Sequence, residues 1–333
     1  PTLPAFAYLP APDGSGFIRL PTEALKPWLA ALLELVGDRT HNFSADSLRI
    51  SRLDALRASA SLGEGVVWEG AKSLRDMLRQ LTGHGEIPAV ALPQGVLAEL
   101  RPYQQQGVNW LQFLRRHSLD GILADDMGLG KTLQTLVHIQ VEKDAGRLTR
   151  PALIIAPVSL MGNWAREAAR FCPHLTALVL HGKDRHQAAV TMSQQDIVIA
   201  PYSLLQRDRE RWLEAKWHIV VLDEAQNIKN ASTNAAQVVS QLQTRHRLCL
   251  SGTPMENHLG ELWSLFHFLM PGFLGSQKRF ASLFRTPIEK MGDAERLAQL
   301  RARVTPFMLR RTKALVESEL PPKVDTVMRV QLS

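Results

Sequence analysis

A glycine-bearing loop that ends in Lys131 and Thr132 carries the residue types needed to bind phosphate groups. An apolar run, residues 121–124, precedes it and apolar residues at helical spacing follow it, so we expect a strand, a tight turn and a helix. Gly128 and Gly130 let backbone N–H groups approach an anion, and the helix start adds its positive dipole end. In this interpretation Lys131 contacts the β- and γ-phosphates of a nucleotide, and the Thr132 hydroxyl ligates Mg²⁺. The predicted nucleotide-binding residues are Gln104, Asp125, Asp126, Met127, Gly128, Leu129, Gly130, Lys131 and Thr132.

A pair of acids, Asp223 and Glu224, extends this interpretation. The usual phosphate loop has glycine where this chain has Asp125, so an ordinary strand-to-helix turn remains the alternative for the loop alone. The acid pair directly follows four apolar residues and therefore lies at the exit of a predicted strand. Asp223 suits a hold on Mg²⁺, and Glu224 suits orienting or deprotonating a water molecule. For the acid pair alone, an ordinary acidic helix start is the alternative. The acid pair and the phosphate loop together predict Lys131, Asp223 and Glu224 as catalytic residues.

The elements that must position these residues are short apolar runs that alternate with helical segments. This pattern predicts a parallel sheet covered by helices on both faces, with ligands at the carboxyl ends of its strands. Ser251, Gly252 and Thr253 follow one such strand, and we expect them to sense hydrolysis at the γ-phosphate, although a plain turn would look the same. The expected strands are residues 121–124, 152–156, 177–180, 196–200, 219–222 and 247–250.

Upstream of the loop, a helix is expected to begin at Pro102, and Gln104 lies in its first turn. A glutamine amide both donates and accepts, which matches the edge of adenine, whereas a solvated glutamine run is the alternative. Residues 1–92 are expected to form a region of their own, with a turn between short strands near 9–16 and helices at 23–36 and 71–81. Residues 49–56 fit a strand and a short helix equally well.

Composition narrows the class of protein. The 333 residues carry a formal net charge of +7, which favours binding to a polyanion. No apolar run is long enough to span a bilayer, so we expect no membrane association. The two cysteines, Cys172 and Cys249, show no metal-binding or redox spacing and are expected to be reduced core thiols. We therefore expect a cytoplasmic protein, associated with the nucleoid if the source is bacterial, and Pro1 in place of Met suggests an excised fragment.

Five ordered motifs over residues 97–333 resemble the first lobe of the switch/sucrose-non-fermenting class of superfamily-two helicase-like ATPases, in its bacterial form. They comprise residues 100–104, 125–132, 223–230, 250–257 and 307–313. The resemblance implies an α/β fold, a RecA-like parallel sheet flanked by helices, with a smaller N-terminal α+β region. It divides the chain into an N-terminal family-associated region at 1–92, a lobe at 93–320 with a helical protrusion at about 258–306, and the start of a linker at 321–333.

The same resemblance implies ATP and Mg²⁺ as cofactors and translocation along double-stranded DNA as the activity. The implied contacts to DNA phosphates are Pro157, Ser159, Lys183, Tyr202 and Ser203. In the helix at Leu262–Leu269, the aromatic stripe is interpreted as core packing.

In the family a second lobe supplies arginine fingers that complete the ATP site. No residue after Thr253 matches such a motif, so we expect this chain alone to bind ATP weakly and to hydrolyse it negligibly. Two alternatives remain open. One is the lobe of an RNA helicase from the same superfamily, and the other is a non-enzymatic module that binds nucleic acid or protein under the control of ATP.

Overall fold

The structure is a computed structural model that describes residues 6–10, 17–21, 76–77, 79–81, 83, 85–252 and 258–318. Several predictions from the sequence lie outside these residues: the helix at 23–36, the segment at 49–56, Thr253 and the linker at 321–333. Within the described part, β1 (Phe6–Pro10) and β2 (Phe17–Pro21) pair antiparallel, as expected for strands on either side of the 9–16 turn. Residues 79–81 are helical, in agreement with the end of the second predicted helix.

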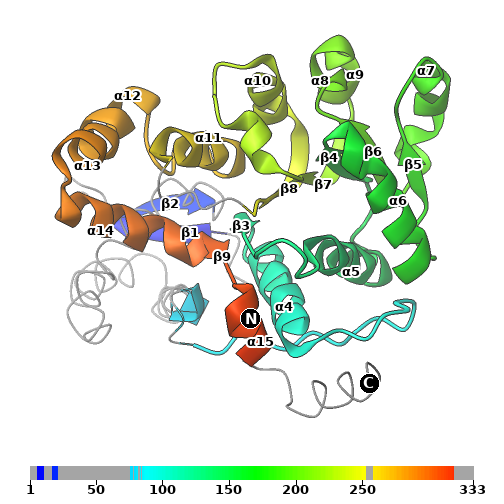
Figure 1. Cartoon of the computed structure of the whole chain (residues 1–333), viewed down its shortest axis with the longest axis horizontal. Helices are drawn as coiled ribbons and strands as arrows, with labels where there is room; N and C mark the ends of the chain where they lie inside the picture. Colours follow the sequence, from blue (N-terminus) through cyan, green and yellow to red (C-terminus); the bar gives the residue numbers. More distant parts are fainter. Residues whose placement is uncertain are drawn as a thin grey trace, which may run out of the picture.

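A parallel sheet of seven strands, in the order β5-β6-β4-β7-β8-β3-β9, forms the centre of the molecule (Figure 1). Every residue of β4 and β6 is buried, which explains why these strands read as continuous apolar runs. The strand β5 lies at one edge and keeps exposed residues. The strands are β3 (Gly121–Leu123), β4 (Ala152–Ala156), β5 (Ala177–Val179), β6 (Ile197–Pro201), β7 (Lys216–Leu222), β8 (Gln243–Leu250) and β9 (Met308–Leu309).

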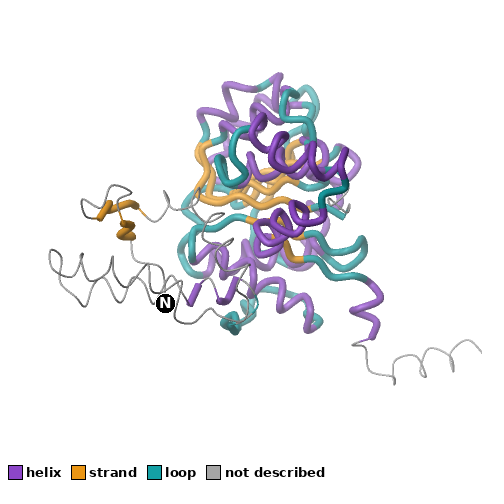
Figure 2. Tube along the Cα trace, turned by 90° about the vertical axis from the view of Figure 1, so that its left-hand side faces the viewer, coloured by secondary structure: helices purple, strands orange, loops and turns teal. Residues whose placement is uncertain are grey.

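Helices cover both faces of the sheet, as Figures 1 and 2 show. The strand order explains which helix lies where. The connections from β3 to β4 and from β4 to β5 run toward the β5 edge of the sheet, whereas the later connections run back toward β9. Because crossovers between parallel strands are right-handed, the helices of these two sets of connections lie on opposite faces of the sheet. One group is α4 (Pro102–Arg116), α5 (Lys131–Asp144) and α6 (Val158–Phe171). The other is α7 (Arg185–Ala188), η2 (Ala189–Gln194), α8 (Leu204–Arg207), α9 (Arg209–Glu214), η3 (Ala225–Ile228) and α10 (Asn234–Gln241).

The segment predicted as a helical protrusion is helical, although the domain boundaries themselves stay predictions. Its first helix packs against β8, and Trp263 and Phe266 are buried in the core, which confirms core packing for the aromatic stripe. Beyond the protrusion, β9 adds a parallel strand beside β3. Apart from β9, the elements between Leu259 and Ser318 are α11 (Leu259–Leu269), α12 (Gln277–Phe280), the π-helix η4 (Ala281–Arg285), α13 (Thr286–Met291), α14 (Ala294–Val304), η5 (Thr305–Phe307) and α15 (Lys313–Ser318).

Two further expectations concern the whole chain. Among the described residues, no helix has both the length and the apolar character needed to cross a bilayer. Cys172 and Cys249 are free thiols in the core, as predicted.

Candidate nucleotide site at the carboxyl edge of the sheet

The predicted site residues converge because their strands are parallel neighbours. In the order β7-β8-β3, Leu222 pairs with Cys249 and Leu123 pairs with Leu250, so the three strands end at the same edge. The Ser251 amide donates to the Leu123 carbonyl at 3.1 Å, which holds the exit of β8 beside the start of the phosphate loop. The loop and the acid pair, nearly one hundred residues apart in sequence, therefore meet at one edge.

The phosphate loop has the backbone shape expected of an anion cradle. Gly128 and Gly130 both have a φ of 85°, in the left-handed region that side chains other than glycine rarely adopt. Lys131 begins α5, and its Nζ donates to the Asp125 carbonyl at 2.7 Å. A Cβ placed on Gly252 would lie 3.8 Å from Lys131 Nζ and 3.3 Å from Met127 Cγ, so the exit of β8 is adjacent to the loop. Lys131 is thus central to the site.

The remaining loop residues have distinct environments. Met127 is exposed, whereas Leu129 is buried. The Leu129 carbonyl accepts hydrogen bonds from Tyr103 Oη at 2.8 Å and from Gln104 Nε2 at 3.3 Å. The predicted adenine-reading residue Gln104 therefore lies against the phosphate loop. Thr132 is half-buried in the first turn of α5.

The Asp125 carboxylate is fully buried and binds Arg311. Arg311 Nε donates to Asp125 Oδ1 at 2.9 Å, and Arg311 Nη2 donates to Asp125 Oδ2 at 2.6 Å. The Asp125 side chain faces Arg311, so it contributes to the loop through this ion pair and through its carbonyl, and contact between Asp125 and nucleotide stays a prediction. Arg311 lies within the motif at 307–313, but nothing local to either residue indicates a pairing across 186 positions.

Asp223 is buried at the end of β7 with a defined hydrogen-bond environment. Its Oδ2 accepts from Trp164 Nε1 at 2.7 Å, and its Oδ1 accepts from the Glu224 amide at 2.9 Å. Burial raises the pKa of the Asp223 carboxyl, whereas the Trp164 hydrogen bond and the Lys131 ammonium act in the opposite direction. The electrostatic influence of Lys131 on Asp223 agrees with their placement in one site. No local sequence pattern indicates this hydrogen bond, because Trp164 lies 59 positions before Asp223.

Glu224 has an unusual backbone for a residue that is not glycine, with a φ of 48°. Its side chain is half-buried, and its Oε2 accepts from Gln226 Nε2 at 2.5 Å. The left-handed turn redirects the chain directly after β7, so Asp223 and Glu224 do not continue as a strand. Two neighbouring carboxylates thereby acquire different environments, which suits two different tasks.

The predicted nucleic-acid contacts lie after β4, β5 and β6, at the same edge as the phosphate loop. Pro157 precedes the first residue of α6, and Ser159, Lys183 and Ser203 are exposed. Tyr202 differs, because its hydroxyl donates to the Asp223 carbonyl at 2.6 Å. The turn after β6 is therefore joined directly to the acid pair after β7.

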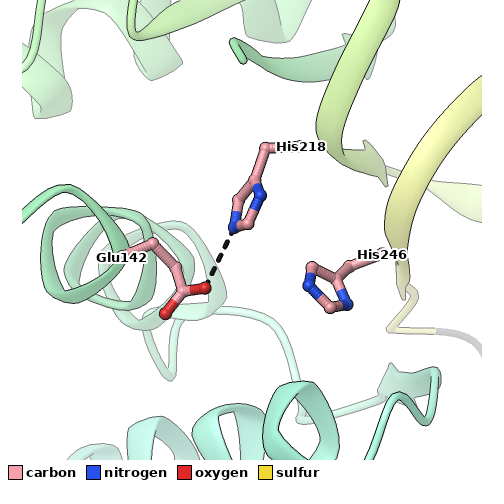
Figure 3. Close-up of side chains that lie close together, drawn as sticks. All are labelled: Glu142, His218 and His246. Atoms are coloured by element: carbon pink, nitrogen blue, oxygen red, sulfur yellow. Dashed lines mark hydrogen bonds and ion pairs between the residues drawn. The ribbon is translucent and has the colours of Figure 1, made fainter. Parts of the chain in front are cut away.

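A second cluster, Glu142, His218 and His246, lies near the opposite end of the sheet, where a helix end meets two strands (Figure 3). These are residue types that bind metals, but His218 Nε2 already contacts Glu142 Oε1 at 2.9 Å. Arg147 donates to Glu142 Oε2 at 2.6 Å. Burial by itself raises the pKa of Glu142, and the hydrogen bonds from His218 and Arg147 outweigh it and lower that pKa. Arg147 thus forms an ion pair with the carboxylate and His218 occupies its other oxygen, so we interpret the cluster as structural.

Known proteins resemble this chain in sequence and in fold. The family described as SNF2-related domain matches residues 103–333. The putative ATP-dependent helicase/translocase YwqA of Bacillus subtilis is 41% identical over 274 residues, covering 81% of this chain and 30% of the relative. The TATA-binding protein-associated factor MOT1 of Saccharomyces cerevisiae is 40% identical over 274 residues, covering 75% of this chain and 15% of the relative.

A solved structure shows the same fold. It is the Sulfolobus solfataricus SWI2/SNF2 ATPase core in complex with double-stranded DNA, with a TM-score of 0.66 and 43% identity. The match covers 70% of this chain and 49% of that core, so this chain corresponds to only part of its relatives. The family match spans most of the chain and includes the phosphate loop, the acid pair and Arg311. The chain belongs to the SNF2-related family of helicase-like ATPases.

Proposed function

We propose that this chain is the ATP-binding motor lobe of a DNA-dependent ATPase that translocates along double-stranded DNA. The observation that carries the proposal is the convergence of Lys131, Asp223 and Gly252 at one edge of the sheet. The phosphate loop supplies a cationic cradle, and the acid pair supplies the groups needed for metal binding and water activation.

The residues of the site suit ATP with Mg²⁺. When phosphate groups bind, Lys131 Nζ exchanges its hydrogen bond with the Asp125 carbonyl for the β- and γ-phosphates. Thr132 and Asp223 would hold Mg²⁺, which neutralises developing charge on the phosphates. Trp164 Nε1 orients the Asp223 carboxylate in the way that an outer hydrogen bond orients a metal ligand.

Glu224 is the residue proposed to act on water. Its carboxylate is half-buried, and the 2.5 Å contact with Gln226 fixes one of its two oxygen atoms. The other oxygen can accept a proton or a hydrogen bond from a water molecule that attacks the γ-phosphate. Replacement of Glu224 by glutamine keeps the shape of the side chain and removes the basic group, so the variant should still bind ATP but hydrolyse it slowly.

Nucleic acid would bind along the loops that follow β4, β5 and β6. Exposed Ser159, Lys183 and Ser203 offer hydroxyl and ammonium donors, which position a protein on a phosphate backbone without reading sequence. The net charge of the chain, +7, is opposite in sign to that of a phosphate backbone and favours the same binding. The relative from Sulfolobus solfataricus was solved with double-stranded DNA, which favours a duplex as the ligand.

A second RecA-like lobe is proposed to complete the site. The chain covers 49% of the related ATPase core, and arginine residues supplied in trans typically contribute about 10³–10⁵ to the rate in this type of chemistry. The 333-residue chain should therefore bind ATP weakly and turn it over negligibly. We also propose a cytoplasmic location, with association with the nucleoid if the source is bacterial.

The test is ATP turnover by the full-length protein with duplex DNA, structured RNA or no nucleic acid. Duplex DNA should stimulate hydrolysis, and Glu224→Gln should lower the stimulated rate by about 10²–10⁴ while ATP still binds. Glu214→Gln, on the exposed surface of α9, is the matched control and should leave the rate unchanged. Stimulation by RNA alone would contradict the DNA assignment, and full activity of Glu224→Gln would contradict the motor assignment.

A further inference from the structure

The segment Met308–Ser318, which we call the strap, runs along the phosphate loop and adjoins it at several points. It contains β9, three connecting residues and α15. β9 pairs with β3, and the Ala124 amide donates to the Leu309 carbonyl at 2.8 Å. The Asp126 amide then donates to the Arg311 carbonyl at 3.0 Å, and the Lys313 amide donates to Asp126 Oδ2 at 3.0 Å. The strap therefore continues the sheet directly into the loop.

Arg311 is the centre of this contact. Besides its two bonds to the Asp125 carboxylate, its amide donates to Asp125 Oδ1 at 2.9 Å. Its Nη2 also donates to Gln134 Oε1 at 2.8 Å, and its Nη1 donates to the Tyr103 carbonyl. Arg311 thus joins the phosphate loop to both α4 and α5 within the core.

The outer side of the loop also touches the strap. A Cβ placed on Gly128 would lie 3.7 Å from Lys313 Nζ, so this ammonium group lies beside the glycine turn of the cradle. Val316 of α15 packs with Tyr103 and Leu129 in a small apolar cluster. Figure 1 shows α15 next to α4. Arg311 therefore contacts the loop within the core, Val316 packs with the loop residue Leu129, and Lys313 lies beside the glycine turn.

This arrangement has a physical consequence for the loop. A fully buried carboxylate requires a cation and hydrogen bonds, and Arg311 supplies both to Asp125. The Asp125 carbonyl is in turn the acceptor of Lys131. A change in the position of Arg311 would move Asp125, and with it the backbone that places Lys131.

We propose that Arg311 is a positioning residue that sets the shape of the phosphate loop through Asp125, and that the strap responds to the nucleotide state of the loop. The proposal rests on the ATP-binding function given above and extends it. Binding of phosphate groups withdraws Lys131 from the Asp125 carbonyl, and the change reaches residues 311–316 through Asp125, Asp126 and Leu129. A nucleotide that binds only the folded loop also suppresses its local opening, so the strap that pairs with the loop is expected to become more protected.

The first experiment measures the affinity of the 333-residue chain for a fluorescent ATP analogue with Mg²⁺. Arg311→Lys keeps the positive charge but loses the planar fork, and Asp125→Asn keeps the shape but loses the charge. Each substitution should weaken the affinity for the analogue by about 10–100-fold. Because both act on one ion pair, the double variant should bind no less tightly than the single variant with the lower affinity. Arg310→Lys, at the exposed neighbouring position, should leave the affinity unchanged.

The second experiment needs no variant and measures hydrogen exchange of residues 312–318 in the wild-type chain. Added Mg²⁺ and ATP should slow exchange there, and unchanged exchange would overturn the proposed response of the strap. A folded Arg311→Lys variant with wild-type affinity and melting temperature would overturn the positioning role. Wild-type chain that binds no ATP would contradict the ATP-binding function itself, which distinguishes that failure from a failure of this inference.

Discussion

At the scale of single residues, the site depends on hydrogen bonds made by atoms that no local motif indicates. Trp164 Nε1 and the Glu224 amide each bind one oxygen of Asp223, which fixes the carboxylate before any ligand arrives. A fixed carboxylate loses little conformational freedom on binding a cation. The position of Asp223 at the end of a strand can be predicted from the sequence. The orientation of its carboxylate cannot, because it depends on Trp164 in α6, the helix that follows β4.

Replacing Trp164 with phenylalanine tests this orientation. The variant should lower the affinity for Mg²⁺ in the presence of ATP by about tenfold, because an outer hydrogen bond to a metal ligand is lost. Trp212→Phe is the matched control, since Trp212 is also buried and donates to the Leu204 carbonyl at 2.9 Å. Both variants should lose about 1–3 kcal/mol of stability, but only Trp164→Phe should change the Mg²⁺ titration of ATP binding. Equal Mg²⁺ titrations for both would contradict the account.

Gly107 provides a second test at this scale. A Cβ there would lie 1.7 Å from Gln134 Oε1 and 2.9 Å from Arg311 Nη2, within the hydrogen-bonded group around Asp125. Gly→Ala inside a helix usually stabilises by about 0.5–1 kcal/mol, and Gly162→Ala in α6 should do so, because only an arginine end, 3.1 Å from the new Cβ, must move. Gly107→Ala should instead destabilise by at least about 1 kcal/mol. Urea unfolding of both variants provides the measurement, and stabilisation by Gly107→Ala would show that the group is loosely packed.

At the scale of elements, parallel pairing converts distant sequence motifs into one site. The apolar runs predicted as strands from 121–124 to 247–250 all occur in the sheet, because buried parallel strands leave a strong pattern. β9 could not be predicted, because its two residues, Met308 and Leu309, are too few to show a hydrophobic periodicity and its partner strand β3 lies far away in sequence. The Arg311–Asp125 pair was missed for the same reason. The resemblance of residues 307–313 to a family motif marked the place but gave no contact.

The link between β6 and β7 should couple nucleic acid to hydrolysis. Tyr202 lies in the loop proposed to contact DNA, and its hydroxyl donates to the Asp223 carbonyl, beside Glu224, the acid proposed to act on water. In the full-length protein, Tyr202→Phe should therefore reduce the stimulation of ATP turnover by duplex DNA more than it reduces ATP affinity. The loss of one hydrogen bond should cost about 1 kcal/mol of stability. An unchanged ratio of stimulated to unstimulated rate would rule out this route of coupling.

At the scale of the whole molecule, two buried histidines should make stability depend on pH. Burial lowers the pKa of His138 to about 4, and burial likewise lowers the pKa of His117 to about 4. The unfolded chain takes up protons at these positions near pH 6.5, whereas the folded chain does so only near pH 4. Their contribution to stability is therefore complete above pH 6.5 and is lost as the pH falls toward 4.

Urea unfolding at pH 7 and pH 5 measures this loss, in a range where most carboxyl groups remain ionised. Each histidine should account for about 2 kcal/mol between these values. His138→Gln should show a smaller difference between the two pH values than the wild type, whatever its absolute stability. Equal stability of the wild-type chain at both pH values would contradict the burial of neutral histidines.

The central claim is that one edge of the sheet forms a triphosphate site around Lys131. Calorimetric titration of the 333-residue chain with a non-hydrolysable ATP analogue and Mg²⁺ tests it most directly. We expect saturable binding at one site, weakened at least about tenfold by Lys131→Ala through loss of a charge-assisted contact, and retained by Glu224→Gln. Equal affinity of the wild type and Lys131→Ala, with both chains folded, would contradict it.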